Sequence, residues 1–151
     1  MPEVIAPTWA DLHAVISDAT DRLRVVTPFY SEEGITQVLD HLGPQTFVAV
    51  TTKLSPPDWA FGVADPIALE DLLDLLPGRH SLGIVQRLHG KAYIADRSHA
   101  LIGSSNLSIG GFNRNVELMV RFRGSEAADA LDAVEAACAG ARPLALGDLS
   151  R

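Results

Sequence analysis

Three pairs of polar residues, each pair separated by a single residue, occur in the second half of the chain. They are His89 and Lys91, Ser104 and Asn106, and Asn115 and Glu117. Residues two apart in an extended strand point to the same face, and the apolar residues near each pair alternate as they do in short strands. Polar groups at the ends of apolar strands are costly to bury unless they bind one another or a ligand. If the three strands are neighbours, the pairs converge on one site.

The residue types in these pairs predict a site that binds an anion with several oxygens. Lys91 supplies a positive charge and several hydrogen-bond donors, and Ser104 and Asn106 supply neutral donors. His89 can act as a nucleophile or as a base, because histidine changes its charge near neutral pH. The sequence therefore predicts acid–base or nucleophilic chemistry beside a bound anion.

The spacing of these residues also resembles a family signature. The HKD motif of the phospholipase D superfamily is matched without a gap or a substitution, and the last pair looks like the Asn and the acidic residue that follow the motif in bacterial nuclease members. The match reads His89-x-Lys91-(x)4-Asp96-(x)6-Gly103-Ser104-x-Asn106, with Asn115-x-Glu117 after it. Fixed residue types at fixed spacing make the resemblance specific, and it covers about a fifth of the chain.

The resemblance implies a catalytic role for four residues. His89 of one copy of the chain would attack phosphorus and form a covalent phosphohistidine. His89 of a second copy would protonate the leaving oxygen and then activate water. Lys91 and Asn106 would bind the non-bridging oxygens and neutralise their charge, which makes a metal or another cofactor unnecessary. Glu117 would orient an imidazole by accepting a hydrogen bond from its second nitrogen.

Supporting roles are expected for the other residues of this region. Ser104, Arg114 and Asn115 are expected to contact the substrate. Asp96 points to the opposite face of its strand from the first polar pair, so we interpret it as a structural anchor of the connection. Gly103 is likewise interpreted as structural.

The motif occurs once, and no internal repeat is visible in the chain. Active sites of the family contain two motifs, brought together within one long chain or by two identical subunits. The resemblance therefore implies a two-fold homodimer whose active site straddles the axis, so that each catalytic residue is present twice.

Length and composition predict one soluble domain over residues 1–151, with a loosely attached tail from about residue 140. The amino terminus shows no secretory signal, and no apolar stretch is long enough to span a bilayer. These features predict a cytoplasmic protein without a membrane partner. The single cysteine, Cys138, excludes an internal disulfide and lies in an alanine-rich helical pattern, which indicates a small buried side chain.

Positive charge is concentrated around the motif in the sequence. The whole chain has a net charge of −7, but the segment from Arg87 to Arg123 contains six basic and two acidic residues, a net charge of +4. Such a distribution suits a phosphate-bearing substrate at one face of an acidic protein. The alternative is that strand edges contain arginines for solubility.

Strands and helices alternate in the first half of the chain, and strands cluster in the second half. Apolar periodicity predicts helices after the cap residues Thr8, Ser31, Asp65 and Ser125, and strands over residues 23–27, 46–51, 81–85, 91–95, 99–103 and 113–122. This order predicts an α/β fold with a mixed β-sheet flanked by helices on both faces. The resemblance adds that the sheet is mostly parallel.

Two aromatic residues, Trp59 and Phe61, lie in a loop expected from Lys53 to Asp65. Aromatic side chains in loops stack on ligands or fix the loop to the core. We favour the second interpretation for both residues.

The leading functional hypothesis is a metal-independent phosphodiesterase that cleaves nucleic acid, above all DNA, because superfamily members of this size with one motif are usually nucleases. By analogy, such an enzyme would be restrained within a larger restriction, defence or repair assembly. One alternative is a phospholipase or phosphatidyl transferase, for which the loop with Trp59 and Phe61 would form the apolar surface. The other is a non-catalytic dimerising or nucleic-acid-binding module, against which the intact motif counts.

Overall fold

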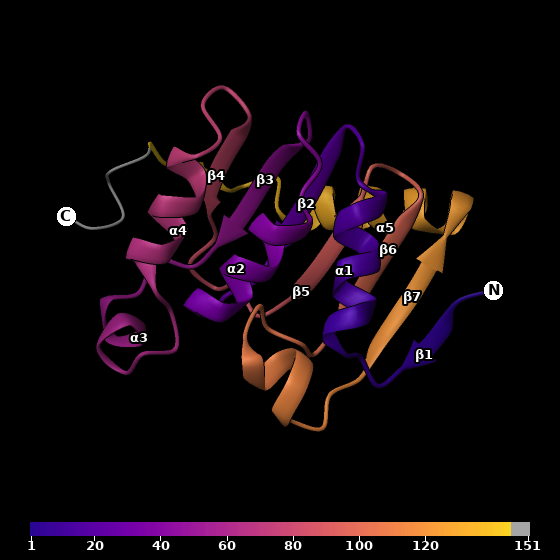
Figure 1. Cartoon of the computed structure of the whole chain (residues 1–151), viewed down its shortest axis with the longest axis horizontal. Helices are drawn as coiled ribbons and strands as arrows, with labels where there is room; N and C mark the ends of the chain where they lie inside the picture. Colours follow the sequence, from indigo (N-terminus) through magenta and orange to yellow (C-terminus); the bar gives the residue numbers. More distant parts are fainter. Residues whose placement is uncertain (146–151) are drawn as a thin grey trace.

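A computed structural model describes residues 1–145 of the chain (Figure 1). Its eight strands form one sheet in the order β1-β7-β6-β5-β2-β3-β4-β8. The strands are β1 (Glu3–Ile5), β2 (Arg22–Val26), β3 (Phe47–Thr52), β4 (His80–Ile84), β5 (Lys91–Ala95), β6 (His99–Gly103), β7 (Met119–Arg123) and β8 (Arg142–Pro143). The helices are α1 (Trp9–Asp18), α2 (Glu32–His41), α3 (Pro56–Ala60), α4 (Pro66–Asp74), α5 (Gly124–Ala137) and the π-helical turn η1 (Gly110–Arg114).

Three of the predicted caps begin helices. At α1 the Thr8 N–H donates to the carboxylate of Asp11 at 2.8 Å, as in a capping box. The Ser31 hydroxyl and the Asp65 carboxylate accept hydrogen bonds from the first turns of α2 and α4, at 3.2 and 3.0 Å. These local signals satisfy backbone donors that a helix otherwise leaves unpaired, which explains why the helix starts could be predicted.

The sheet is mixed and flanked by helices, as predicted, but it is not mostly parallel. Only β2 with β3 and β3 with β4 are parallel; the other five pairings in residues 1–145 are antiparallel. Parallel neighbours need a long crossover, which α2 provides between β2 and β3, and α3 with α4 between β3 and β4. β5, β6 and β7 are instead joined by segments that turn back at the sheet edge, so each strand reverses the direction of the one before.

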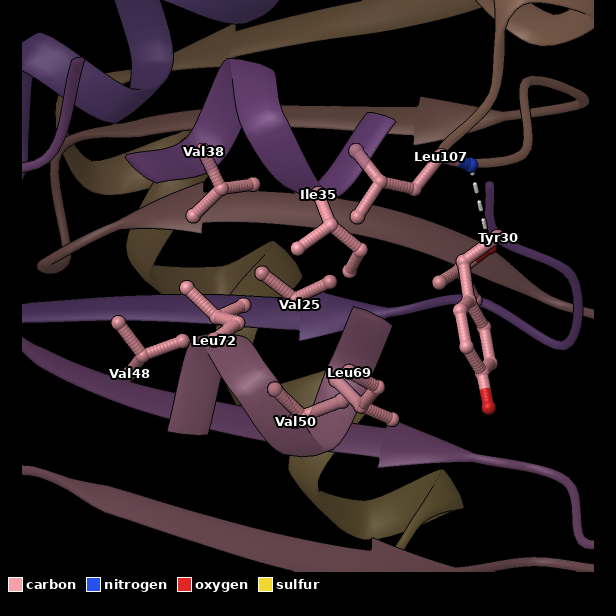
Figure 2. A pocket seen from close by; sticks show the side chains of 10 residues that line it. Val25, Tyr30, Ile35, Val38, Val48, Val50, Leu69, Leu72 and Leu107 are labelled. Carbon is pink, nitrogen blue, oxygen red and sulfur yellow. Dashed lines mark hydrogen bonds between the residues drawn. The ribbon is translucent and has the colours of Figure 1, made fainter. Parts of the chain in front are cut away.

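Helices cover both faces of the sheet (Figure 1). α1, α2 and α4 lie on one face, and their apolar stripes form the larger core with alternate residues of the central strands. Figure 2 shows part of this core, where α2, α4 and the sheet surround a small apolar pocket. Its labelled lining consists of Val25, Tyr30, Ile35, Val38, Val48, Val50, Leu69, Leu72 and Leu107.

α5 covers the opposite face and forms a smaller core. Ile94 and Ala100 point to this face and pack with Leu131 of α5 and with Cys138, which directly follows the helix. Cys138 is buried, which confirms its interpretation as a small apolar side chain. The helix begins two residues earlier than expected, with Arg123 and not Ser125 at the N-cap position, because Gly124 adopts a φ of 58° that turns the chain out of β7.

The predicted strand over residues 113–122 is wrong in its first half. Residues 110–114 form η1 instead, and β7 begins at Met119. Phe112 of η1 is buried, with its ring centroid 5.4 Å from those of Trp9 and Tyr93. This long-range packing overrides the local alternation of apolar residues.

Short elements at the margins were not predicted. β1 pairs with β7 and β8 pairs with β4, so the expected loose tail is wrong for Arg142 and Pro143; residues 146–151 lie outside the described part. The expected loop from Lys53 to Asp65 contains the one-turn helix α3.

Within residues 1–145, no helix combines the length and the apolar character needed to cross a membrane.

Candidate active site

The structure brings the three polar pairs together at one edge of the sheet. β5 and β7 begin at this edge and β6 ends there, because the three strands are antiparallel neighbours. Lys91 is paired with Gly103, and Gly103 with Met119. Gly103 has no room for a side chain, since a Cβ would lie 2.4 Å from the Leu118 carbonyl oxygen. Of the six polar residues only Lys91 lies within a strand; the others occupy the adjoining segments.

Lys91 is buried beside an exposed histidine. The residue exposes 6% of its surface, and its Nζ lies 3.3 Å from Nδ1 of His89. Burial lowers the pKa of Lys91, and the negative charge of Glu117 partly opposes this effect. A buried ammonium next to an exposed imidazole is well placed to bind an anion that approaches from solvent.

Glu117 is held by neutral partners of its own chain. Its carboxylate accepts hydrogen bonds from the Ser104 hydroxyl and, at 3.4 Å, from the Asn115 amide. The Ser104 hydroxyl in turn accepts from the Leu118 N–H at 3.0 Å. No hydrogen bond joins Glu117 to His89 within residues 1–145 of one chain. A single chain therefore does not supply the contact expected to orient the imidazole.

The loop that presents Asn106 is fixed from several sides. The Tyr93 hydroxyl donates to the carbonyl of the preceding residue at 2.8 Å, and the Thr27 hydroxyl accepts from the N–H of the next residue at 3.3 Å. Gly111 of η1 packs so closely that a Cβ there would lie 2.0 Å from the Asn106 carbonyl oxygen. The side-chain oxygen of Asn106 is buried and lacks a hydrogen-bond partner in the described chain. Buried polar atoms normally have partners, so this oxygen can accept a hydrogen bond from a ligand or a second chain, whereas a phosphoryl oxygen would be bound by the amide nitrogen, which donates.

Tyr93 and Thr27 were not predicted as part of this site. A tyrosine in a buried strand is a weak signal, because its hydroxyl must find a partner. Thr27 gave no signal, since its contact is made between segments 80 residues apart. The described residues also contain no group of three or more His, Cys, Asp or Glu arranged to hold a metal ion.

The basic residues around the motif divide between the two ends of the sheet. Arg97 lies in the turn after β5 and pairs with Asp132 at 2.9 Å. Arg121 lies in the middle of β7 and pairs with Asp11 at 2.6 Å, and Arg123 ends β7 at the edge of the sheet opposite the site. The prediction that positive charge gathers at the motif is therefore wrong for three of the six basic residues, because they lie along β7 or at the opposite end of β5. The other three basic residues, Arg87, Lys91 and Arg114, lie at the edge of the sheet that holds the site, and both arginines are exposed.

Asp96 lies at the opposite end of β5 from Lys91. Its carboxylate accepts hydrogen bonds of 2.9–3.1 Å from the backbone of Thr20, Asp21 and Arg22 and from the Thr20 hydroxyl. These partners are three backbone N–H groups and one hydroxyl. Asp96 thus joins the β5–β6 turn to the start of β2, at the end of β5 away from the site.

Asp96→Ala is expected to lower the free energy of unfolding by about 2 kcal/mol, because several charge-assisted hydrogen bonds are lost at a partly exposed position. Burial raises the pKa of Asp96, but the hydrogen bonds from Arg22, Thr20 and Asp21 outweigh it and hold the pKa below its usual value. The stabilisation is therefore complete above about pH 4 and is lost as the pH falls through the lowered folded pKa.

Urea unfolding at neutral and at acid pH measures this difference from the wild type. Asp132→Ala is the control, because it removes an exposed carboxylate near the same end of the sheet. The anchor interpretation of Asp96 is wrong if both variants unfold at the wild-type midpoint at neutral pH.

Comparisons with known proteins agree with this geometry. A family profile described as "Cardiolipin synthase, PLD-like domain" matches residues 12–136. The fold is similar to that of NucT from Helicobacter pylori, with a TM-score of 0.69 and 12% identity over 95% of this chain and 99% of that one. Nuc from Salmonella typhimurium, a phospholipase D family member, has a TM-score of 0.69 and 14% identity, with the same coverage of 95% and 99%.

A larger protein has the same fold in part. The phosphatidylserine synthase of Haemophilus influenzae Rd KW20 matches with a TM-score of 0.68 and 14% identity over 95% of this chain but 39% of that one. No curated protein matches the sequence. At these identities the solved structures establish the fold, and the profile covers most of the chain, including the whole of the motif. The chain therefore belongs to the phospholipase D-like family.

Proposed function

We propose that this protein is a metal-independent phosphodiesterase that cleaves nucleic acid, with DNA as the expected substrate. Family membership supports chemistry at a phosphodiester bond. The observation that carries the proposal is the grouping of His89, Lys91 and Asn106 at one sheet edge, with the ammonium of Lys91 buried and 3.3 Å from the imidazole. The proposal places the enzyme in the cytoplasm, restrained within a larger restriction, defence or repair assembly.

The proposed reaction has two steps. In the first, Nε2 of one His89 attacks phosphorus, the bond from phosphorus to the leaving oxygen breaks, and the second His89 gives its proton to that oxygen. In the second, the second His89 takes a proton from water, the water oxygen attacks phosphorus, and the bond to the first His89 breaks. Lys91 and Asn106 bind the non-bridging oxygens and stabilise their charge in both steps.

The contacts of the His89 imidazole support a second copy of the chain in the active site. Nδ1 of His89 lies 3.3 Å from Nζ of Lys91 and has no carboxylate beside it within residues 1–145 of its own chain. Attack through Nε2 needs the proton on Nδ1, where a carboxylate would hold it. Glu117 of a partner copy could supply this carboxylate, because within residues 1–145 Glu117 makes no hydrogen bond to His89 of its own chain. The apolar side chains that flank Glu117 are also exposed, Val116 by 98% and Leu118 by 58%, as expected of a surface that a partner covers.

Two observations support nucleic acid as the substrate. Arg87 and Arg114 are exposed at the site edge and can contact a polyanion on either side of the scissile phosphate. The chain also matches NucT and Nuc over nearly their whole length, whereas it matches only 39% of the phosphatidylserine synthase. The extent of the match therefore favours NucT and Nuc, and not the larger synthase, as guides to the substrate.

A lipid phosphodiester is the second candidate substrate. The description of the family profile and the likeness to a phosphatidylserine synthase favour it. The structure adds exposed apolar side chains near α3, namely Phe61, Val63 and Ile67. These residues lie on short segments and do not form a long amphipathic helix, which a lipid surface would favour.

The test is cleavage in excess EDTA of single-stranded DNA, plasmid DNA, RNA and phosphatidylglycerol vesicles, with His89→Ala protein as the control for contaminating enzymes. We expect wild-type cleavage of nucleic acid that survives chelation and is absent from the variant. Cleavage of the vesicles alone would establish the lipid candidate. Cleavage that EDTA abolishes would contradict the metal-independent mechanism.

A further inference from the structure

The two aromatic residues before α4 have different environments. Trp59 is partly buried and packs against the larger core, which confirms the structural interpretation for this residue. That interpretation is wrong for Phe61, which exposes 84% of its surface. Covering the exposed ring with a ligand would remove apolar surface from water, which is favourable.

The segment that presents Phe61 is held in one conformation. The N–H groups of Phe61, Gly62 and Val63 each donate at 3.1 Å to carbonyls of residues 57–59. Gly62 has a φ of 73°, which is readily accessible to glycine and closes this turn. Below the turn, Lys53 pairs with the carboxylate of Asp58 at 2.8 Å. A ring on a fixed turn loses little conformational entropy when a flat ligand stacks on it.

Tyr30 connects this segment to the loop of the active site. Its N–H donates to the Val63 carbonyl at 3.1 Å, and it forms isolated parallel bridges with Ala64 on one side and Leu107 on the other. Neighbouring strands are about 4.8 Å apart, so the backbones of Ala64 and Leu107 are about 10 Å apart. Leu107 directly follows Asn106 of the site. α3 and η1 lie at the same edge of the sheet (Figure 1).

We propose that Phe61 is a stacking platform for an unpaired base, a few nucleotides from the scissile phosphodiester, and that the substrate is therefore single-stranded nucleic acid. The inference rests on the proposed function. A single fixed aromatic ring suits the flat face of a base. In a duplex these faces are covered by neighbouring base pairs, so a ring in this position gains nothing from an intact double strand. Phe61 is three residues from Ala64, which is at most about 11 Å of extended chain, so it lies within about 20 Å of Leu107, a separation that a few nucleotides can span.

The test compares two substrates in EDTA, a single-stranded oligonucleotide and bis(p-nitrophenyl) phosphate, which has no base. For Phe61→Ala, we expect kcat/KM for the oligonucleotide to fall by about 5- to 150-fold, mainly through KM, and the ratio of the two substrates to fall by nearly the same factor. Phe61→Trp should restore the ratio. Leu75→Ala is the matched control, because Leu75 is also exposed, by 65%, at the opposite end of α4.

An abasic nucleotide moved along the oligonucleotide locates the stacked base. One position should weaken cleavage by the wild type but not by Phe61→Ala, because the two changes remove the same contact. Equal losses on both substrates, or no loss on the oligonucleotide, would overturn the platform while the proposed function stands. If Phe61→Ala loses activity only on phosphatidylglycerol vesicles assayed in parallel, the ring contacts a lipid and the base platform is wrong. A wild type that cleaves neither diester would remove the proposed function and this inference together.

Discussion

His89→Ala is expected to reduce phosphodiesterase turnover by at least about 10⁴-fold, because the variant loses both the nucleophile and the general acid. In a dimer one substitution removes both groups, since each subunit contributes the same residue. The protein should remain folded, because His89 is exposed and, in the part of the chain that the structure describes, its side chain has a hydrogen bond to Lys91 alone. Steady-state rates in EDTA and a thermal unfolding curve measure the two quantities.

A covalent intermediate provides the sharper test. Wild-type protein quenched during turnover of an end-labelled oligonucleotide should retain label on a denaturing gel, and acid should release it, as expected for a phosphohistidine. His80→Ala is the control histidine, because His80 begins β4 at the opposite edge and contacts the backbone of Leu76. Label that persists in His89→Ala would identify a different nucleophile and overturn the mechanism.

Lys91→Met is expected to lower kcat by about 10²- to 10³-fold, because the ammonium neutralises charge that develops on the phosphoryl oxygens. Methionine fills a similar volume without the charge. The pH profile gives a second signature. Burial lowers the pKa of Lys91 and Glu117 raises it only in part, so the protonated, active form is lost as the pH rises through a value below the usual 10.5. Wild-type activity should therefore show an early alkaline decline.

Controls separate this effect from a general loss of charge. Arg97→Met removes one positive charge at the far end of β5 and should leave the pH profile unchanged, because Arg97 pairs with Asp132 and not with the site. The residual activity of Lys91→Met should lack the alkaline decline of the wild type. If both enzymes decline at the same pH, another group controls that limb and Lys91 has a purely structural role.

Much of the fold could be predicted because its signals are local. The caps Thr8, Ser31 and Asp65 begin helices where the sequence indicates, and β5 and β6 have their predicted bounds. The direction of strand pairing could not be predicted from these signals. The sheet is largely antiparallel because β5, β6 and β7 turn back at their edges, and the general likeness of the family to parallel sheets gave the wrong expectation for this feature.

The elements that were missed depend on contacts between distant residues. β1 has three residues and exists because it pairs with β7. η1 replaces the expected strand because Gly111 packs on the Asn106 loop and Phe112 enters the core. Apolar alternation is a property of neighbouring residues, so it could not report either contact.

By itself the sequence determined which chemical groups are present and which strands bring them to one edge. The imidazole, ammonium, amide and carboxylate are set by residue identity, and the alternation of apolar residues predicts the strands that position them. Only the tertiary structure decided how these groups interact. It buries Lys91 beside His89, binds Glu117 to Ser104, and places three of the six basic residues between Arg87 and Arg123 away from the site. The reason is that burial, pKa and charge distribution depend on the packing of segments far apart in the chain, which no local pattern encodes.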